Sequence, residues 1–282
     1  MATAPQASPA IRLTAPRSEL GRVVSGQLAA AAKVARKADA GEALLNLALQ
    51  PANTLLHDGW AWQRTTPARI VRETRNALTA AAADDGFLVH ASYAFLRAAE
   101  QTGRVGDHLR PIVEAALEAE AMVLESSLPA CVVRVGYVYG PQSADFKAYR
   151  AAFRIARPYW AGPKSHLQHH VHSIDAARAL LEAARRRPAG RLLYATDDRP
   201  ASFAAFGDHF ARLVGNPLPT HIPRIGKPFV RFIIADEQVE MLEIGVHGPA
   251  APKVPGFSPQ YVDYRAGLAA VMEDWTRGEN QY

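Results

Sequence analysis

Short apolar runs alternate with longer segments of helical periodicity along this chain, and that alternation restricts the fold more than any other feature. The runs predict strands at 11–14, 129–135 and 191–195. The segments between them predict helices at 67–83, 111–126 and 174–187. Short strands separated by helices favour an α/β fold, with a parallel sheet covered by helices on both faces.

The first of these helices carries a clear start signal. Thr66 offers a capping hydroxyl and Pro67 fits the first helical turn, where its missing N–H costs nothing. Apolar residues then recur at helical spacing up to Gly86. Pro111 opens the next helix in the same way, and its alanine-rich face would permit close approach of another helix.

The turn at 14–22 follows the first strand, where a dinucleotide-binding loop would lie. Such a loop uses three glycines, for the tight turn, for the approach of the pyrophosphate and for helix–strand packing. Here Gly21 alone remains, while Ala15 and Ser18 place side-chain atoms where the phosphates would be. Pro16 also removes a backbone N–H that would face an anion. The turn therefore predicts weak dinucleotide binding or none.

Several later segments carry a likeness to one family, in the family's order. They are 53–57, which is similar to a strand of that family, Thr74-Arg75-Asn76 in a helix, 87–92, which is similar to the family's next strand and ends in Ser92, Val133-Arg134-Val135-Gly136-Tyr137-Val138-Tyr139-Gly140-Pro141, Val171-His172-Ser173-Ile174-Asp175-Ala176-Ala177, and Gly256-Phe257-Ser258-Pro259 followed by Tyr264-Arg265-Ala266-Gly267-Leu268. Together they resemble the extended short-chain dehydrogenase/reductase superfamily, in its NAD-dependent epimerase/dehydratase group.

The resemblance implies a Rossmann-like doubly wound parallel sheet with a smaller C-terminal substrate lobe. We expect a tail at 1–9, the core at 10–158, and a mixed segment at 159–282 that adds the last core elements and the lobe. The family pairs two helices with their copies in a second subunit, so a homodimer through 67–83 and 111–126 is expected.

The chain departs from the family at the catalytic helix. Counting back from Glu120, which resembles the glutamate of Y-x-x-x-K-x-x-x-E, places Ile112 at the tyrosine and Ala116 at the lysine. Neither side chain has a titratable proton. Between Gly21 and Asp39 the chain is also too short for the helix and two strands that the family has there. We therefore expect no cofactor, with NAD or NADP as the alternative.

Residues that follow the strands' carboxyl ends are the candidates for a pocket. Ser92 matches a catalytic position of the family, and Tyr93 or Tyr137 would then act as the acid. The expected substrate-binding residues are Trp60, Trp62, His90, Ile112, Tyr139 and His166. Such aromatic walls suit a flat or apolar small molecule, although each ring alone is as well explained by packing.

A run of histidines, His166, His169, His170 and His172, forms a second constellation, with Asp175 three residues after the last of them. Imidazoles at this spacing bind zinc or act as general acids and bases. A strand flanked by a loop rarely encloses a metal without ligands from elsewhere, so no metal is expected. His169 or His166 is expected to serve the pocket instead.

Composition narrows the class of protein. The chain has 282 residues, 49% apolar and 21% charged, which is enough to bury a large core. The formal net charge of +5 comes from scattered arginines, and the cluster Arg185-Arg186-Arg187 ends a helix, so nucleic-acid binding is not expected. No apolar run reaches membrane length and 1–9 does not read as a signal peptide. The single Cys131, in an apolar strand, fits a reducing cytoplasm.

Three functions remain open from the sequence. The first is a cofactor-independent lyase, isomerase, cyclase or dehydratase acting on an aromatic or polyketide-like metabolite, which the aromatic loops favour. The second is a non-catalytic pseudo-enzyme that binds a metabolite or a partner, which the loss of tyrosine and lysine favours. The third is an NAD(P)-dependent epimerase or reductase with unusual cofactor binding.

Overall fold

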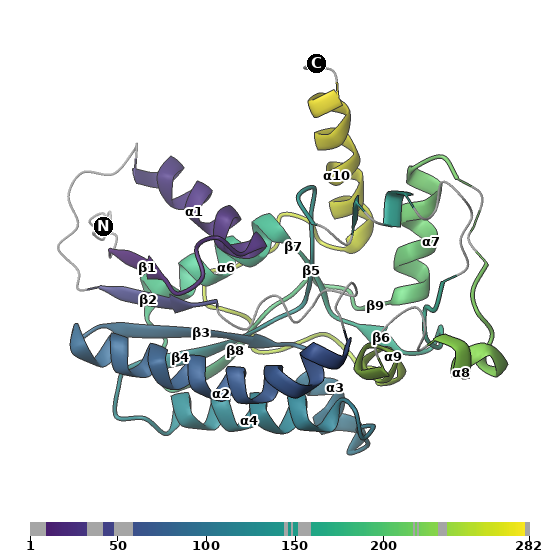
Figure 1. Ribbon diagram of the computed structural model, residues 1–282. Coiled ribbons are helices and arrows are strands. Elements are labelled where there is room, and N and C mark those ends of the chain that lie inside the picture. Colours follow the sequence, from purple (N-terminus) through teal and green to yellow (C-terminus); the bar gives the residue numbers. More distant parts are fainter. Residues whose placement is uncertain are drawn as a thin grey trace.

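Five parallel strands form the central sheet of the computed structural model, in the spatial order β1, β2, β3, β4 and β8 (Figure 1). Their bounds are Ile11–Leu13, Ala43–Asn46, Phe87–Tyr93, Ala130–Val135 and Arg191–Ala195. The structure describes residues 10–32, 42–47, 59–143, 146–147, 149–151, 159–216, 218, 220–230 and 236–279, with the backbone alone at 31–32, 59–65, 224 and 278–279.

The two middle strands are buried along their whole length, as parallel strands covered on both faces must be. Their alternate side chains point to opposite faces of the sheet. In β3, Phe87 and Val89 join one apolar cluster and Leu88 joins another. The register places Asn46 beside His90 and Ser92 beside Arg134, so these polar side chains share a face.

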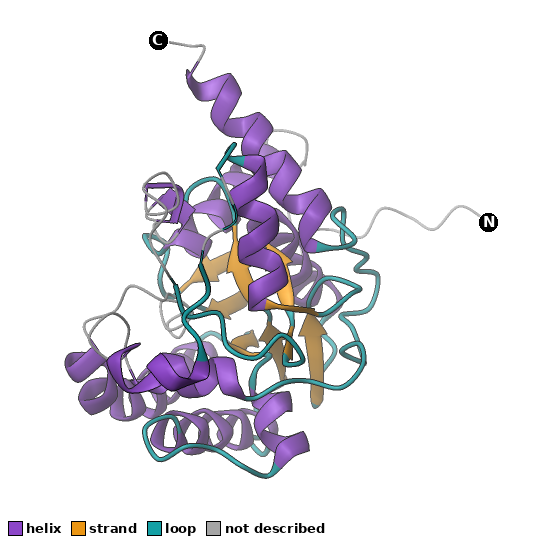
Figure 2. Cartoon of the chain, turned by 90° about the vertical axis from the view of Figure 1, so that its right-hand side faces the viewer, coloured by secondary structure: helices purple, strands orange, loops and turns teal. Residues whose placement is uncertain are grey.

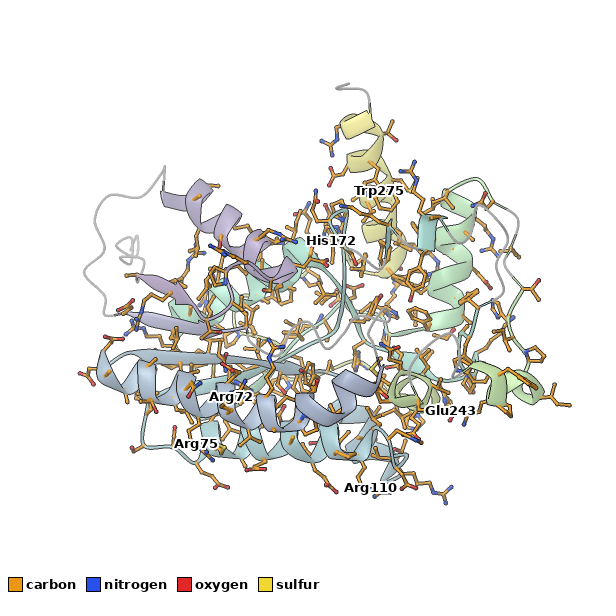
Figure 3. The ribbon with its side chains drawn as sticks, in the orientation of Figure 1. Arg72, Arg75, Arg110, His172, Glu243 and Trp275 are labelled. Carbon is orange, nitrogen blue, oxygen red and sulfur yellow. The ribbon has the colours of Figure 1, made fainter. Side chains whose placement is uncertain are left out.

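Helices cover both faces of the sheet (Figure 1). On one side α1 (Glu19–Ala32) packs with α6 (Ser173–Arg186), and on the other α2 (Gly59–Ala83) packs with α4 (Arg110–Leu124). The short α3 (Leu96–Thr102) follows β3 directly. Figure 3 shows Arg72, Arg75 and Arg110 on the outer side of α2 and α4, turned away from the sheet.

The remaining elements form a smaller lobe beyond the carboxyl ends of the strands (Figures 1 and 2). β5 (Tyr137–Tyr139) pairs in parallel with β7 (His170–His172), and β6 (Leu167–Gln168) pairs antiparallel with β9 (Ala201–Ser202). The lobe's helices are α7 (Phe203–Leu213), the short η2 (Arg224–Gly226), α8 (Lys227–Val230), α9 (Asp236–Glu243) and α10 (Tyr264–Glu279). Aromatic side chains of β5, β7 and α7 fill the lobe's core.

The α/β class and the parallel sheet are confirmed, and the predicted strands at 11–14, 87–92, 129–135 and 191–195 are found in place. The strand β2, which pairs with both β1 and β3, was not predicted, and the predicted strand 53–57 lies outside the described residues. The predicted start of the next helix at 67 is wrong. Helix α2 begins at Gly59, so Pro67 lies inside it and Trp60 and Trp62 stand on a helix, not a loop.

Cys131 is a buried residue of β4, as expected, and burial raises the pKa of its thiol to about 12. Within the part of the chain that the structure describes, none of the helices combines the length and apolar character that a membrane span needs. No three His, Cys, Asp or Glu side chains of the described residues come together as a metal site.

Candidate functional site

A small cavity lies where the carboxyl ends of β3 and β4 meet the lobe. Its volume is about 30 Å³, enough for one or two water molecules. The wall is apolar on most sides and carries a few polar groups, which is the usual composition of a small-molecule site. It is lined by Phe95, Val135, Tyr137, Gln168, His169, His170, Phe203, Met241 and Leu242.

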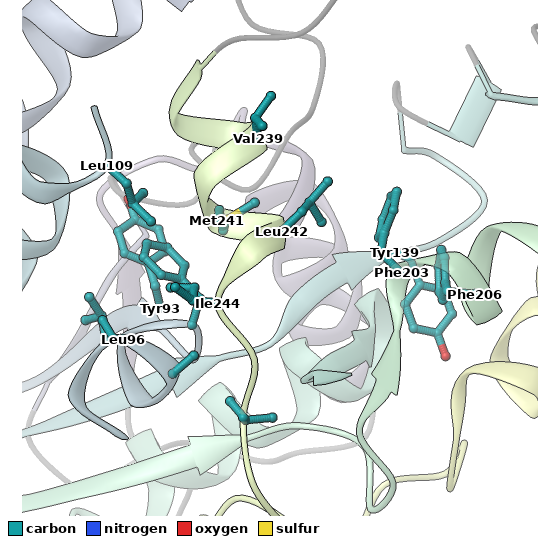
Figure 4. Packing of buried hydrophobic residues seen from close by; sticks show 14 of the residues in the cluster. Tyr93, Leu96, Leu109, Tyr139, Phe203, Phe206, Val239, Met241, Leu242 and Ile244 are labelled. Atoms are coloured by element: carbon teal, nitrogen blue, oxygen red, sulfur yellow. The ribbon is translucent and has the colours of Figure 1, made fainter. Parts of the chain in front are cut away.

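The elements that meet at the cavity are far apart in sequence. Phe95 follows β3, Tyr137 begins β5, His169 separates β6 from β7, and Phe203 begins α7. Helix α9 closes the remaining side with Met241 and Leu242. Figure 4 shows these two side chains between Tyr93 and Leu96 on one side and Tyr139, Phe203 and Phe206 on the other.

Two buried histidines of this wall, His169 and His170, have no hydrogen-bond partner for either ring nitrogen among the described residues. His169 is 4% exposed. Burial, reinforced by the charges of Arg97 and Lys253, lowers its pKa to about 4. The imidazole is therefore neutral near pH 7, with one nitrogen able to donate a hydrogen bond and the other able to accept one.

Two rings stand beside His169. His170 stacks on Phe206 with ring centroids 4.6 Å apart, and burial lowers its pKa to about 3. Tyr137 is half-buried and meets His170, Phe203 and Phe206 edge to face, with centroids 5.7 to 6.0 Å apart. This packing fixes the Tyr137 ring at the cavity wall.

Ser92 lies elsewhere, in a buried ion-pair cluster between the sheet and α4. Its hydroxyl donates to Glu120 Oε1 at 2.6 Å, and the side chain is fully buried. Arg134 donates to Glu120 Oε2 at 2.6 Å and to Glu100 Oε1 at 2.6 Å. We call Ser92, Glu100, Glu120 and Arg134 the Arg134 cluster. Every one of these four side chains has a partner within it.

The Arg134 cluster also fixes the rotation of α4 against the sheet. Glu120 points inward to Arg134, so Ala116 and Ile112, one and two turns earlier, share its inward face. Ala116 is fully buried and Ile112 is 1% exposed, both in the apolar core with Tyr93 and Phe95. The structure therefore places Ile112 in packing, with no access to the cavity wall.

The other predicted residues are dispersed. Tyr93 is fully buried and stacked on Phe95 with centroids 5.3 Å apart, and burial raises its pKa. His90 Nδ1 accepts a hydrogen bond from the Asn46 amide at 3.0 Å, and burial lowers its pKa to about 4.

The predicted residues of the lobe also lie apart from one another. Tyr139 is buried, with its hydroxyl 3.4 Å from Asp197 Oδ2. His166 is half-buried beside Gly245. The side chains of Trp60 and Trp62 lie outside the described residues.

Of the predicted catalytic residues, the structure thus brings Tyr137 and His169 together at one cavity and places Ser92 and Tyr93 away from it. The sequence reasoning missed Gln168 and gave His170 no role. Gln168 Nε2 donates to the backbone carbonyl of Met241 at 3.3 Å and so ties β6 to α9. The histidine run was the sequence signal available for Gln168 and His170, because both residues lie within it.

The β1–α1 turn is closed by its own side chain. Ser18 Oγ accepts from the Gly21 N–H at 3.0 Å and donates to the Ala15 carbonyl at 2.8 Å, which is an N-cap. A Cβ on Gly21 would collide with the Ala15 carbonyl oxygen, so this glycine serves the turn's packing. Glu19 adds an acidic side chain in the first turn of α1. A bound pyrophosphate would compete with that cap and meet that charge.

Ten residues, 33–42, separate α1 from β2 along the chain. In the described sheet β1 is the edge strand.

Solved structures with the same fold cover almost the whole chain. The human epimerase family protein SDR39U1 (isoform 2) with NADPH has a TM-score of 0.69 and 16% identity, over 94% of this chain and 99% of that one. RMD from Pseudomonas aeruginosa complexed with NADPH has 0.65 and 16%, over 95% and 99%. MoeE5 in complex with UDP-glucose and NAD has 0.64 and 18%, over 96% and 99%. At these identities the likeness establishes the fold alone.

One curated relative matches by sequence. It is a 3-diazoavenalumate denitrifying reductase of a Streptomyces species, 28% identical over 158 residues. The match spans 55% of this chain and 51% of the relative. Models of known protein families give no match to the chain.

Proposed function

We propose that this chain, which has the fold of the NAD-dependent epimerase/dehydratase group of the extended short-chain dehydrogenases/reductases, is a non-redox enzyme that needs no dinucleotide. In this proposal a small aromatic metabolite binds in the cavity beside β5, β7 and α9, and the reaction is of the lyase, isomerase, cyclase or dehydratase type. The fold itself is established by the solved structures that share it.

The observation that carries the proposal is His169. A buried polar group without a hydrogen bond costs about 1–3 kcal/mol, and a packed core residue would avoid that cost. A ligand that hydrogen-bonds to the ring would supply the missing partners. The neutral imidazole would accept a proton from the substrate at its unprotonated nitrogen, and the Tyr137 hydroxyl would hold or return a proton on the other side.

The cavity's walls support an aromatic substrate. Phe95, Phe203 and Tyr137 offer ring faces and edges to a flat molecule. The volume of about 30 Å³ takes water alone, so a metabolite enters when Met241 and Leu242 of α9 move aside. Methionine is well suited to this because its unbranched side chain repacks at low cost. Closure over the substrate would then exclude water from His169.

Three observations support the absence of a dinucleotide. The β1–α1 turn is capped by Ser18 and carries Glu19, only ten residues separate α1 from β2, and Ile112 and Ala116 are packed in the core. Ile112, at the position that corresponds to the family's tyrosine, has no acidic proton to donate during hydride transfer.

A second candidate is a reductase, and the curated relative favours it. That protein is described as a reductase and matches about half of this chain. Titration of the purified chain with NAD(H) and NADP(H) by calorimetry separates the two candidates, with an intact family member as the positive control. We expect no heat of binding up to millimolar dinucleotide. Micromolar binding would overturn the proposal and favour the reductase.

The role of His169 is tested by His169→Phe, which keeps a ring and removes both nitrogens. We expect no loss of thermal stability, because unpaired polar atoms are replaced by apolar ones, and a loss of ligand binding and turnover in a panel of aromatic metabolites. The matched control is His247→Phe at an exposed position. Equal binding by both variants would show that His169 is merely a packed ring.

A further inference from the structure

We propose that Arg97 and His169 form an anion subsite at one end of the cavity, and that the substrate is an aromatic carboxylate. This inference rests on the proposed function, because it assigns a chemical class to the ligand of the same cavity. Arg97 stands in the first turn of α3, two residues after Phe95, which lines the cavity.

Arg97 is half-buried and makes no ion pair or side-chain hydrogen bond with any described residue. Its Nε is buried without a partner. The guanidinium carbon lies 5.7 Å from the centre of the Tyr194 ring, a contact that holds the side chain in place but satisfies none of its donors. The buried Nε is the donor that lacks a partner, and a buried polar group without a hydrogen bond costs free energy.

The neighbouring arginine shows why no carboxylate among the described residues serves Arg97. Arg134 lies 5.9 Å from the same Tyr194 ring and donates hydrogen bonds to both nearby carboxylates, Glu120 and Glu100. Within the described part of the chain, Arg134 is thus bonded to two acids and Arg97 to none. An external anion is the missing partner that this arrangement would accept.

His169 supplies the second donor. Its ring is 96% buried, lines the cavity and has both nitrogens unpartnered among the described residues. Arg97 and Lys253 both lie close enough for their charges to lower its pKa, so the positive field at the ring favours an anion. Lys253 itself is bonded to Asp198 and to the Thr196 carbonyl, so it adds field and no free donor.

The surroundings of the donor set favour a carboxylate. One guanidinium presents a two-pronged fork that matches a carboxylate or a phosphate, and a neutral imidazole adds one N–H. The choice of a carboxylate carried on a ring therefore rests on the apolar wall beside these donors. The apolar rest of the cavity, Phe95, Phe203 and Tyr137, would then hold the ring that carries the carboxylate.

The test compares benzoate with benzamide, which has nearly the same shape and no charge, and with inorganic phosphate. Dissociation constants are measured by ligand-observed NMR for the wild-type chain, for Arg97→Gln and for the exposed control Arg104→Gln. We expect Arg97→Gln to weaken benzoate binding about tenfold or more, since charge-assisted pairs are the strong ones. Arg104→Gln should leave it unchanged, and phosphate should not compete.

Three results would contradict the inference. They differ in whether the proposed function fails with it. If benzamide binds as well as benzoate and Arg97→Gln changes neither, the aromatic cavity stands and the anion subsite fails. If neither compound binds the wild-type chain, the subsite and the proposed function fail together. Competition by phosphate at equal affinity would assign the corner to a general anion and not to a carboxylate.

Discussion

The Arg134 cluster and the cavity both hold buried polar side chains, and Arg134 and Arg97 both lie near the Tyr194 ring, yet the two regions are built in opposite ways. In the Arg134 cluster Ser92 donates to Glu120, and Arg134 donates to Glu120 and Glu100. His169 at the cavity wall has two ring nitrogens without a partner among the described residues, and Arg97, two residues after the wall residue Phe95, has a buried Nε without one. One region has its hydrogen bonds completed by the fold and the other does not.

This difference is the reason why the proposed function places the ligand at the cavity. A buried polar group that is fully bonded contributes to the fold or is neutral, whereas an unbonded one costs free energy in the absence of a ligand. The position that resembles the family's catalytic serine, Ser92, falls in the bonded region. The groups that keep hydrogen-bonding capacity among the described residues include His169 at the cavity wall.

The largest expected effect comes from breaking the bonded region. Arg134→Met removes the cation that serves Glu120, which is 3% exposed, and leaves that carboxylate buried without its partner. Removing one member of a buried ion pair costs about 3–5 kcal/mol. Urea unfolding followed by circular dichroism measures the loss. Arg72→Met, at an exposed position on α2, is the control and should change stability by less than about 0.5 kcal/mol. A loss below about 1 kcal/mol at Arg134 would show that the cluster is not structural.

A second effect is expected from Asp197, a buried carboxyl on the lobe side of β8. Its Oδ1 has no partner among the described residues, and burial, with the nearby Asp175, raises its pKa to about 8. Because the folded-state pKa lies above the unfolded one, its contribution to stability is full below about pH 4 and is lost as the pH rises toward 8. Asp197→Asn should remove this loss.

Unfolding free energies of the Asp197→Asn variant and the wild-type chain at several pH values measure the difference. From about pH 5.5 to about pH 7.5 the variant should gain at most about 2.7 kcal/mol relative to the wild type, at 1.36 kcal/mol per pH unit. The exposed Asp107→Asn serves as the control, with no change in pH dependence. Parallel stability curves for Asp197→Asn and the wild type would mean that the carboxyl is ionised in the folded chain.

The sequence predicted the sheet better than the site, and particular residues show why. β3 and β4 are continuous apolar runs, so their identity is local information. β2 is a mostly apolar run of only four residues, which is too short for its pattern to tell a strand from part of a helix. Thr66 and Pro67 look like a helix start, and helix α2 nevertheless extends back to Gly59.

The site was harder to predict because its walls come from distant segments. In β3 the two-residue period places Ser92 on the face of Leu88, against α4, and that direction was available from the sequence. The residues that surround His169 at the cavity could not be predicted in this way. Phe95, Phe203 and Met241 reach the cavity through the packing of α9 and α7 on the sheet, which local patterns do not encode.

The smallest expected effect concerns the β1–α1 turn and sharpens the same comparison, because there too a side chain of the fold completes the hydrogen bonds. Ser18→Ala removes the cap on the Gly21 N–H and should cost about 1 kcal/mol, while Ser18→Gly should cost a few tenths. Thermal unfolding of both variants and the wild type, with and without millimolar NADPH, measures this. If the turn is a self-contained cap, NADPH shifts none of the three melting temperatures. A rise of several degrees with NADPH would mean that the amides of α1 receive a phosphate, since a ligand that binds the folded state alone must stabilise it.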